Sequence, residues 1–204
     1  MTDKFIIESF WQNNDYGNCV SVAVIKAAMI KHGYNSVFSA IEKRRNYFII
    51  TLRNEKLILL SKKEILKFNK KKAIDFENYS DQKRQQNCEL LKEAVELCIA
   101  VMTKYIKEYD YRKEEYKEKE AIKAVLNGLN TDDAYELLGI STTKRLRLRG
   151  RIPTKLLKEK ALVIYNDFHA IVASGGYYDQ YGTAKALKFD LDHVQERAWL
   201  YQVT

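Results

Sequence analysis

The densest apolar pattern in the chain lies between residues 19 and 32 and predicts a buried helix. Apolar side chains cover nearly the whole helical circumference: Val20, Val22, Ala23, Val24, Ile25, Ala27, Ala28, Met29 and Ile30. A helix that is apolar on almost every side is buried in the middle of a domain. Gly33 follows directly and is a typical helix end. We therefore expect the helix Cys19–His32 to be the central element of the fold.

The first third of the chain also predicts a hairpin. Residues 4–11 form a short apolar stretch that leads into a polar loop over residues 12–18. Two runs of strand-forming residues, 47–53 and 56–61, are separated by a short polar link and predict a β-hairpin. Residues 64–68 predict either a short helix or a strand.

Helices dominate the middle of the chain. The polar residues 78–84 predict a loop. Apolar positions at helical spacing predict a long helix over residues 86–108. A thin apolar stripe predicts another helix over residues 113–126, which Gly128 can close. A capping sequence predicts a short helix over residues 132–138.

Strands dominate the last third of the chain. Residues 141–154 are polar and basic, and the alternation within residues 144–149 predicts an edge strand with a basic face. A strip that contacts phosphate groups is the less favoured alternative. Further strands are predicted over residues 161–165, 168–174, 184–190 and 198–203. Gly175, Gly176 and Gly182 mark the turns between them. Because helices come first and strands last, the fold class is predicted to be α+β.

The composition is that of one globular domain. Hydrophobic residues make up 46% of the 204 residues and charged residues 30%, as in ordinary folded proteins. There is one Pro and no Gly/Ser-rich linker, so no domain boundary is visible. We expect a single domain over residues 1–204, with a helical half over about 1–140 and a β-rich half over about 141–204.

The net charge of +8 suits contact with nucleic acid, anionic lipid or acidic proteins. Glutamates within residues 109–123 interrupt the positive charge. The basic residues 144–149 have no interleaved aromatic residues for base stacking. Nucleic-acid binding is therefore possible but not favoured over a protein or peptide partner.

No apolar run reaches the roughly 18 residues that a membrane-spanning helix needs, so we expect no membrane span. The start of the sequence lacks the basic and then apolar plan of a secretory signal. If the chain begins here, we expect a cytoplasmic protein.

Three cysteines with no CxxC pair argue against a disulfide framework or a zinc ribbon. We expect no metal and no cofactor. Cys88 and Cys98 fall within a helical pattern and are expected in the core. Cys19 opens the central helix, where unpaired backbone N–H groups and the helix dipole favour a thiolate, the nucleophilic form of cysteine. The alternative is an inert thiol on an apolar helix.

Gln12 and His169 are the candidate partners of Cys19. The amide of Gln12, just upstream, can point back toward the sulfur and stabilise an oxyanion. A cysteine hydrolase also needs an imidazole beside its thiolate to carry the proton. His169 begins an apolar strand and is the candidate for that imidazole.

A cysteine hydrolase also needs a hydrogen-bond acceptor on the other imidazole nitrogen to fix the orientation of the ring. If strands 168–174 and 184–190 pair as a hairpin, the end of the second strand returns to the start of the first, and Asp190 falls beside His169. Asp192 could replace Asp190. Asp167 and Asp179 are weaker options because each needs a different turn.

The order of these residues resembles that of papain-like cysteine peptidases, and the spacing is closest to the calpain catalytic core. Gly17-Asn18-Cys19 stands where calpains have Gly-Asp-Cys, and His169-Ala170 stands where they have His-Ala. The motifs between and after them are matched by the hairpin 47–61, by Leu90-Leu91-Lys92-Glu93-Ala94, by residues 128–139 and by Leu187-Lys188-Phe189-Asp190.

The resemblance implies a papain-like fold in which a central N-terminal helix carries the Cys and packs against a C-terminal antiparallel sheet. It implies a Cys-His-Asp triad of Cys19, His169 and Asp190, with Gln12 in the oxyanion site. Gly17, Asn18 and Asp192 are the further residues expected at the binding site.

Three departures from the family pattern matter. Gln12 is one residue further from the Cys than in the family, so Asn13 is an alternative oxyanion donor. No Trp follows the Cys, and Asp190-Leu191-Asp192 stands in place of Asn-Pro-Trp. A carboxylate orients imidazole at least as well as an amide, so an Asp in this position is chemically competent. No acidic loop has calcium-ligand spacing, so calcium control is not implied.

The sequence therefore predicts a cysteine hydrolase, or a related acyltransferase, that acts on a peptide or isopeptide amide. The alternative is a catalytically inactive module of the same fold that binds protein or nucleic acid through its basic surface. The substrate and the oligomeric state do not follow from the sequence.

Overall fold

The structure is a computed structural model that describes residues 1–13, 15–70, 72–109, 118–127, 129, 131–148, 154–156, 158–159, 161–166, 169–187 and 198–204. In chain order, its helices and strands are α1 (Asp3–Ser9), β1 (Phe10–Gln12), α2 (Cys19–His32), β2 (Ala40–Lys43), β3 (Tyr47–Thr51), β4 (Leu57–Ser61), α3 (Lys62–Phe68), β5 (Ile74–Phe76), α4 (Gln82–Tyr109), α5 (Glu118–Asn127), α6 (Thr131–Leu137), β6 (Thr142–Leu148), β7 (Leu162–Tyr165), β8 (Ala170–Ser174), β9 (Tyr177–Gln180), β10 (Thr183–Ala186) and β11 (Ala198–Val203), with a 3₁₀ turn at Thr154–Leu156.

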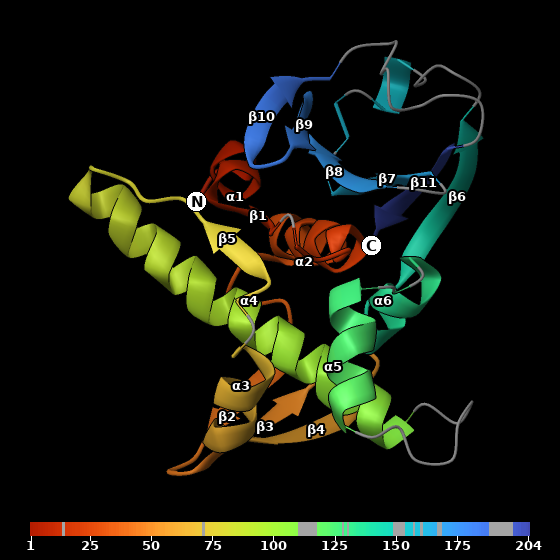
Figure 1. Cartoon of the computed structure of the whole chain (residues 1–204). Helices are drawn as coiled ribbons and strands as arrows, with labels where there is room; N and C mark the ends of the chain where they lie inside the picture. Colours follow the sequence, from red (N-terminus) through yellow and green to blue (C-terminus); the bar gives the residue numbers. More distant parts are fainter. Residues whose placement is uncertain are drawn as a thin grey trace.

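The central helix α2 lies between a large antiparallel sheet and the helices α4 and α6 (Figure 1). The sheet has the strand order β10-β9-β8-β7-β11-β6, and every neighbouring pair in it is antiparallel. Helix α2 packs against β8, β7 and β11 on one side, and against α4 and α6 as well. The α+β class predicted from the order of the elements is confirmed.

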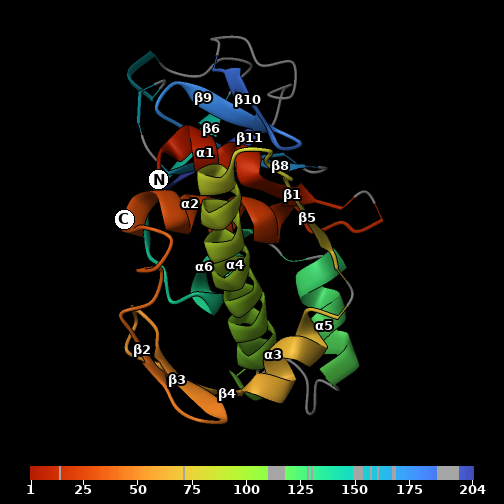
Figure 2. The same cartoon turned by 90° about the vertical axis from the view of Figure 1, so that its left-hand side faces the viewer.

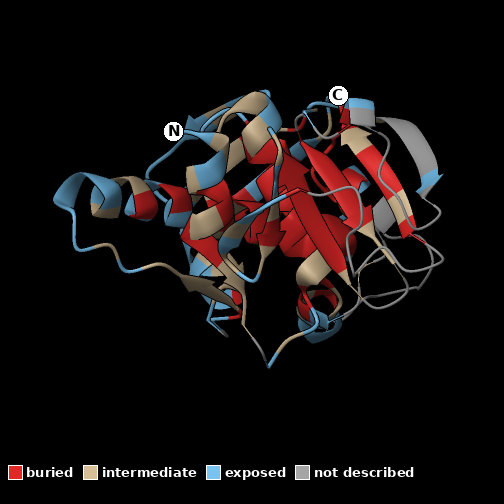
Figure 3. Ribbon diagram, turned by 90° about the horizontal axis from the view of Figure 1, so that it is seen from above, coloured by how far each residue is buried: buried red, intermediate tan, exposed pale blue. Residues whose placement is uncertain are grey.

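Helix α2 has the bounds and the burial that its sequence predicts. Every residue from Ser21 to Met29 is buried. The helix ends at Gly33, which has φ +91° and donates its backbone N–H to the carbonyl of Met29 at 2.8 Å. Buried residues gather in the middle of the molecule and exposed ones at its periphery (Figure 3). The apolar core thus forms around α2.

A smaller sheet, β2-β3-β4, lies at the far end of the long helix α4 (Figure 2). The predicted hairpin is confirmed as β3 and β4, with Ile50 opposite Ile58. Residues 64–68, for which the sequence predicts either a short helix or a strand, belong to helix α3. Its start is a capping box, in which Ser61 Oγ accepts the Glu64 N–H at 3.2 Å and a Glu64 carboxylate oxygen accepts the Ser61 N–H at 2.8 Å.

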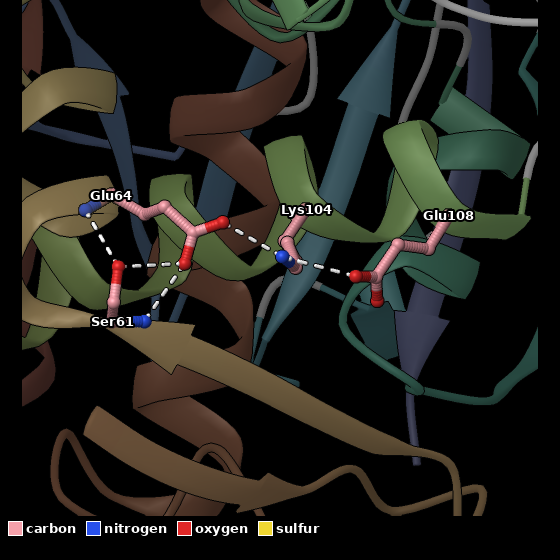
Figure 4. A network of polar contacts seen from close by, with 4 residues as sticks. All are labelled: Ser61, Glu64, Lys104 and Glu108. Atoms are coloured by element: carbon pink, nitrogen blue, oxygen red, sulfur yellow. Dashed lines mark hydrogen bonds and ion pairs between the residues drawn. The ribbon is translucent and has the colours of Figure 1, made fainter.

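The capping box continues into an ion-pair network that ties α3 to α4 (Figure 4). Lys104 Nζ lies 2.7 Å from a Glu64 carboxylate oxygen and 3.0 Å from one of Glu108. Burial by itself raises the pKa of Glu64. The hydrogen bonds from Lys104 and from Ser61 outweigh burial and lower this pKa to about 2. The ionised carboxylate therefore stabilises this junction.

Several boundaries differ from the sequence-based prediction. The stretch 4–11 is mostly the helix α1, which Thr2 caps by accepting the Phe5 N–H at 3.2 Å. The predicted loop 78–84 is partly helical, because Asp81 accepts the Arg84 N–H at 2.8 Å and starts α4 at Gln82. Strands β2 and β5 were not predicted, since both are short and mostly unburied. The predicted helices in the middle of the chain and the basic edge strand β6 are present, with shifted ends.

The predicted pairing of strands 168–174 and 184–190 is wrong. Strand β8 pairs with β9, and β9 pairs with β10, so three strands form a meander. The chain leaves β10 with the Leu187 N–H bonded to the Gly176 carbonyl at 2.7 Å. That point lies at the end of β8 away from His169. The hairpin argument that placed Asp190 beside His169 therefore fails, and Asp190 lies outside the described residues.

Among the described residues, no helix is both long enough and apolar enough to cross a membrane.

Candidate functional site

Gln12, Cys19 and His169 line one small pocket beside the first turn of α2. They come from three separate segments: the end of β1, the start of α2 and the residue before β8. The remaining lining residues are Trp11, Val22, Ala23, Ala170, Ile171, Asp179 and Tyr181. The structure thus brings together the three residues that the sequence proposed for nucleophile, proton carrier and oxyanion donor.

Cys19 is a free, half-buried thiol at the first residue of α2. The loop before it is held from two sides. Gly17 donates its N–H to the side-chain oxygen of Asn127 at 3.2 Å, and the buried Asn18 amide donates to the Ala73 carbonyl at 2.9 Å. Neither residue lines the pocket. Gly17 and Asn18, predicted as binding residues, therefore hold the loop that presents Cys19.

The other two cysteines differ from Cys19 in their surroundings. Cys88 and Cys98 are free and buried. Burial raises the pKa of both thiols, most strongly for Cys98, and nearby carboxylates add to the increase at Cys88. At neutral pH both are therefore protonated and poorly nucleophilic. This difference provides two internal controls for the reactivity of Cys19.

The choice between Gln12 and Asn13 as oxyanion donor favours Gln12. The Asn13 amide donates to both carboxylate oxygens of Asp75, each at 3.1 Å, and its own oxygen accepts the Asp15 N–H. Gln12 lines the pocket, and the oxygen of its side-chain amide is buried without a hydrogen-bond partner among the described residues. An amide that is not engaged elsewhere can turn to donate to a substrate oxygen.

His169 is held by its backbone and by the face of its ring. Its N–H donates to the Asn166 side-chain oxygen at 2.8 Å, and its carbonyl accepts the Asn166 N–H at 3.0 Å. The imidazole stacks on Tyr181, with ring centroids 5.2 Å apart and planes inclined by 25°. Tyr181 lies in the turn between β9 and β10, so that turn contacts one face of the imidazole.

The carboxylate of Asp179 also lines the pocket, but both of its oxygens are engaged by other groups. Oδ2 lies 2.6 Å from Lys26 Nζ, and Oδ1 accepts the Gly182 N–H at 2.8 Å. Asp179 is a weaker option for the group that orients His169, and these contacts already engage it with Lys26 and Gly182. Asp167, Asp190 and Asp192, the other options, lie outside the described residues.

The sequence did not point to Trp11 and Tyr181, which line the pocket, or to Lys26, which is bonded to the pocket residue Asp179. Lys26 is fully buried within α2. Burial lowers its pKa, while the charge of Asp179 and the hydrogen bond to it raise that pKa. The signal in the sequence was one cationic residue in the middle of a helix that is apolar on all other sides. Such a residue, if buried, requires a counter-charge from elsewhere in the fold.

A second, larger cavity lies at the other end of α2. It has a volume of about 580 Å³, and its walls come from the segment after α2, the small sheet, α3 and α4. Helix α2 has 14 residues and is therefore about 20 Å long, so this cavity is remote from Cys19. Among the described residues, no cluster of three or more His, Cys, Asp or Glu side chains is arranged to hold a metal ion.

No family model matches the chain, and neither does any curated protein or solved structure. The residues of the pocket are therefore the basis for assigning a function.

Proposed function

We propose that the protein is a cysteine hydrolase, or a related acyltransferase, that acts on peptide or isopeptide amides through a papain-like arrangement. The observation that carries the proposal is the meeting of Gln12, Cys19 and His169 in one pocket from three distant segments. The packing of a Cys-bearing helix against an antiparallel sheet supports the papain-like part of the proposal.

In the proposed reaction, the Cys19 sulfur attacks the carbonyl carbon of the substrate amide. His169 accepts the thiol proton and then donates it to the leaving amine, which breaks the C–N bond. The Gln12 amide and the backbone N–H of Cys19 donate hydrogen bonds to the oxyanion. Water then attacks the thioester carbonyl, His169 accepts a proton from that water, and the acid and free thiol are released. An acceptor amine in place of water would give acyl transfer.

The identity of the third triad member stays a prediction. Asp190 is the residue proposed from the family resemblance, with Asp192 as its alternative. Asp179 stays the weaker option, because its two oxygens already accept hydrogen bonds from Lys26 and from Gly182.

The experiment that tests the proposal is alkylation of the native protein by iodoacetamide between pH 5 and 10, read by intact mass and peptide mapping. A thiolate–imidazolium pair makes Cys19 react rapidly at pH 6, and His169→Ala slows that reaction strongly. His32→Ala is the matched control, since His32 lies at the opposite end of the same helix. If Cys19 reacts only near the pH at which a free thiol ionises, or no faster than Cys88 and Cys98, the proposal is wrong.

The basic edge strand favours a second candidate function, binding of an acidic partner without catalysis. Strand β6 is the outermost strand of the large sheet and contains the sequence Lys144-Arg145-Leu146-Arg147. Arg147 is exposed and lies over the ring of Trp199 at 5.9 Å. Binding of an anionic polymer that weakens steeply as salt is raised, in a protein whose Cys19 is unreactive, would favour this candidate.

A further inference from the structure

One face of α2 connects the proposed nucleophile to a buried charge. Cys19, Val22 and Ala23 line the pocket, and Lys26 is the next residue along the same face, two turns after Cys19. A spacing of seven residues returns a side chain to nearly the same side of a helix, about 10 Å further along its axis. Any group that binds Lys26 therefore fixes its own position relative to Cys19.

Lys26 makes two hydrogen bonds and lies over one aromatic ring. Nζ lies 2.7 Å from the Ile7 carbonyl oxygen and 2.6 Å from Asp179 Oδ2, and it lies 4.9 Å from the centre of the Phe10 ring. Packing alone does not require an ammonium group here, because an apolar side chain of similar length would fill the same space without a desolvation cost. What the ion pair adds is a specific, directional link from α2 to β9.

That link extends to the imidazole of His169. Asp179 Oδ1 accepts the Gly182 N–H at 2.8 Å and so closes the turn between β9 and β10. Tyr181 lies between them in sequence and stacks on His169. Gly182 is pressed against Trp11, since an added Cβ would lie 2.3 Å from a carbon of the indole ring.

We propose that the buried Lys26–Asp179 pair is a positioning device, which holds the Tyr181 turn against His169 and so sets the imidazole relative to the Cys19 thiol. The part of this inference that concerns the reactivity of Cys19 rests on the proposed function. Its structural content, that the pair controls the stacking of Tyr181 on His169, does not depend on catalysis. Lys26 and Asp179 are then positioning residues, and Tyr181 is the part of the device that touches the imidazole.

The decisive variant is Lys26→Met/Asp179→Leu, which replaces the pair with apolar side chains and leaves no buried charge unpaired. The matched control is Lys104→Met/Glu64→Leu, which removes another close ion pair, with a 2.7 Å contact, from a junction that does not line the pocket. Tyr181→Ala and Tyr181→Phe separate loss of the stacked ring from loss of its hydroxyl. Urea unfolding confirms that each variant is folded before it is compared.

The first measurement is the NMR spectrum of the His169 ring in each variant. Stacking on Tyr181 shifts the ring resonances away from those of an exposed histidine. The shift is expected to disappear in Lys26→Met/Asp179→Leu and in Tyr181→Ala, and to persist in the control and in Tyr181→Phe. A shift that survives in Lys26→Met/Asp179→Leu overturns the inference, whether or not the protein is an enzyme.

The second measurement is the pH profile of Cys19 alkylation. Misplacement of a catalytic group by about 1 Å can cost up to about a hundredfold in rate, so we expect the rate at pH 6 to fall about tenfold or more in Lys26→Met/Asp179→Leu. The rate at high pH, where any thiol is ionised, should be retained. If wild-type Cys19 has no His169-dependent reactivity at pH 6, the proposed function fails, and the NMR result alone decides the inference. If wild type has it and Lys26→Met/Asp179→Leu keeps it, the inference fails and the proposed function stands.

Discussion

Removal of one partner of the buried Lys26–Asp179 pair should destabilise the fold strongly. In Lys26→Met, the Asp179 carboxylate, which is 8% exposed, keeps the Gly182 N–H but loses its cation. An uncompensated charge in such a site typically costs about 3–5 kcal/mol. Whole domains are stable by only about 5–15 kcal/mol, so this single substitution threatens the folded state.

The assay is equilibrium unfolding in urea at pH 7, followed by circular dichroism. With a urea dependence of about 2 kcal/mol per molar, a cost of about 4 kcal/mol lowers the midpoint by about 2 M. In Lys26→Met/Asp179→Leu no unpaired charge remains, so most of the stability should return. A loss below about 1 kcal/mol in Lys26→Met, or a double variant no more stable than Lys26→Met, would refute the reasoning.

Three further predictions concern the rest of the described structure. The Glu64 pKa of about 2 lies below its unfolded value, so the carboxylate stabilises the fold above about pH 4.3 and loses this effect as the pH falls toward 2. Glu64→Gln should therefore cost about 1 kcal/mol at pH 7. If the urea midpoints of wild type and Glu64→Gln differ as much at pH 2.5 as at pH 7, this reasoning is contradicted. Burial first, and then neighbouring positive side chains, lower the pKa of His32 to about 4, so unfolding stability should fall as the pH drops from 6.5 to 4, and a His32→Asn variant that keeps the same pH slope would show that another group is responsible. Gly182 has φ +80°, and a Cβ added there would lie 2.3 Å from Trp11. Gly182→Ala should therefore lower the free energy of unfolding by about 1–3 kcal/mol and change the fluorescence of that indole. Unchanged thermal unfolding would disprove the close contact.

Local pattern was a reliable guide wherever an element is decided by its own residues. The bounds of α2 follow from an apolar run that ends at Gly33, and the β3–β4 hairpin follows from two strand-like runs with a short link. Cys19 and His169 could be proposed as nucleophile and proton carrier for the same reason, since Cys19 begins a helix and His169 precedes a strand. The boundaries missed at α1 and α4 depend on single caps, Thr2 and Asp81, within otherwise ambiguous segments.

Strand pairing was the point at which local pattern failed. Strand β9 is mostly polar and aromatic and lies between two glycine turns, so its sequence resembles that of a connecting loop. Because β9 lies between them, β10 runs parallel to β8. The residues after β10 therefore begin at the end of β8 that lies away from His169. A direct hairpin partner of β8 would instead end beside His169. One unrecognised strand of four residues therefore removed the argument for Asp190.

The sequence by itself determined the α+β class, the buried helix at its centre, and the nomination of Gln12, Cys19 and His169 as candidates. These follow from the period of the apolar positions and from residue chemistry, which act over a few neighbouring residues. Only the tertiary structure decided that Gln12 rather than Asn13 is available to the pocket, and that Lys26 is paired with Asp179. Those partners are up to 153 positions apart in the chain, and no local pattern records which distant charge will meet a buried one, because that meeting depends on how whole elements pack.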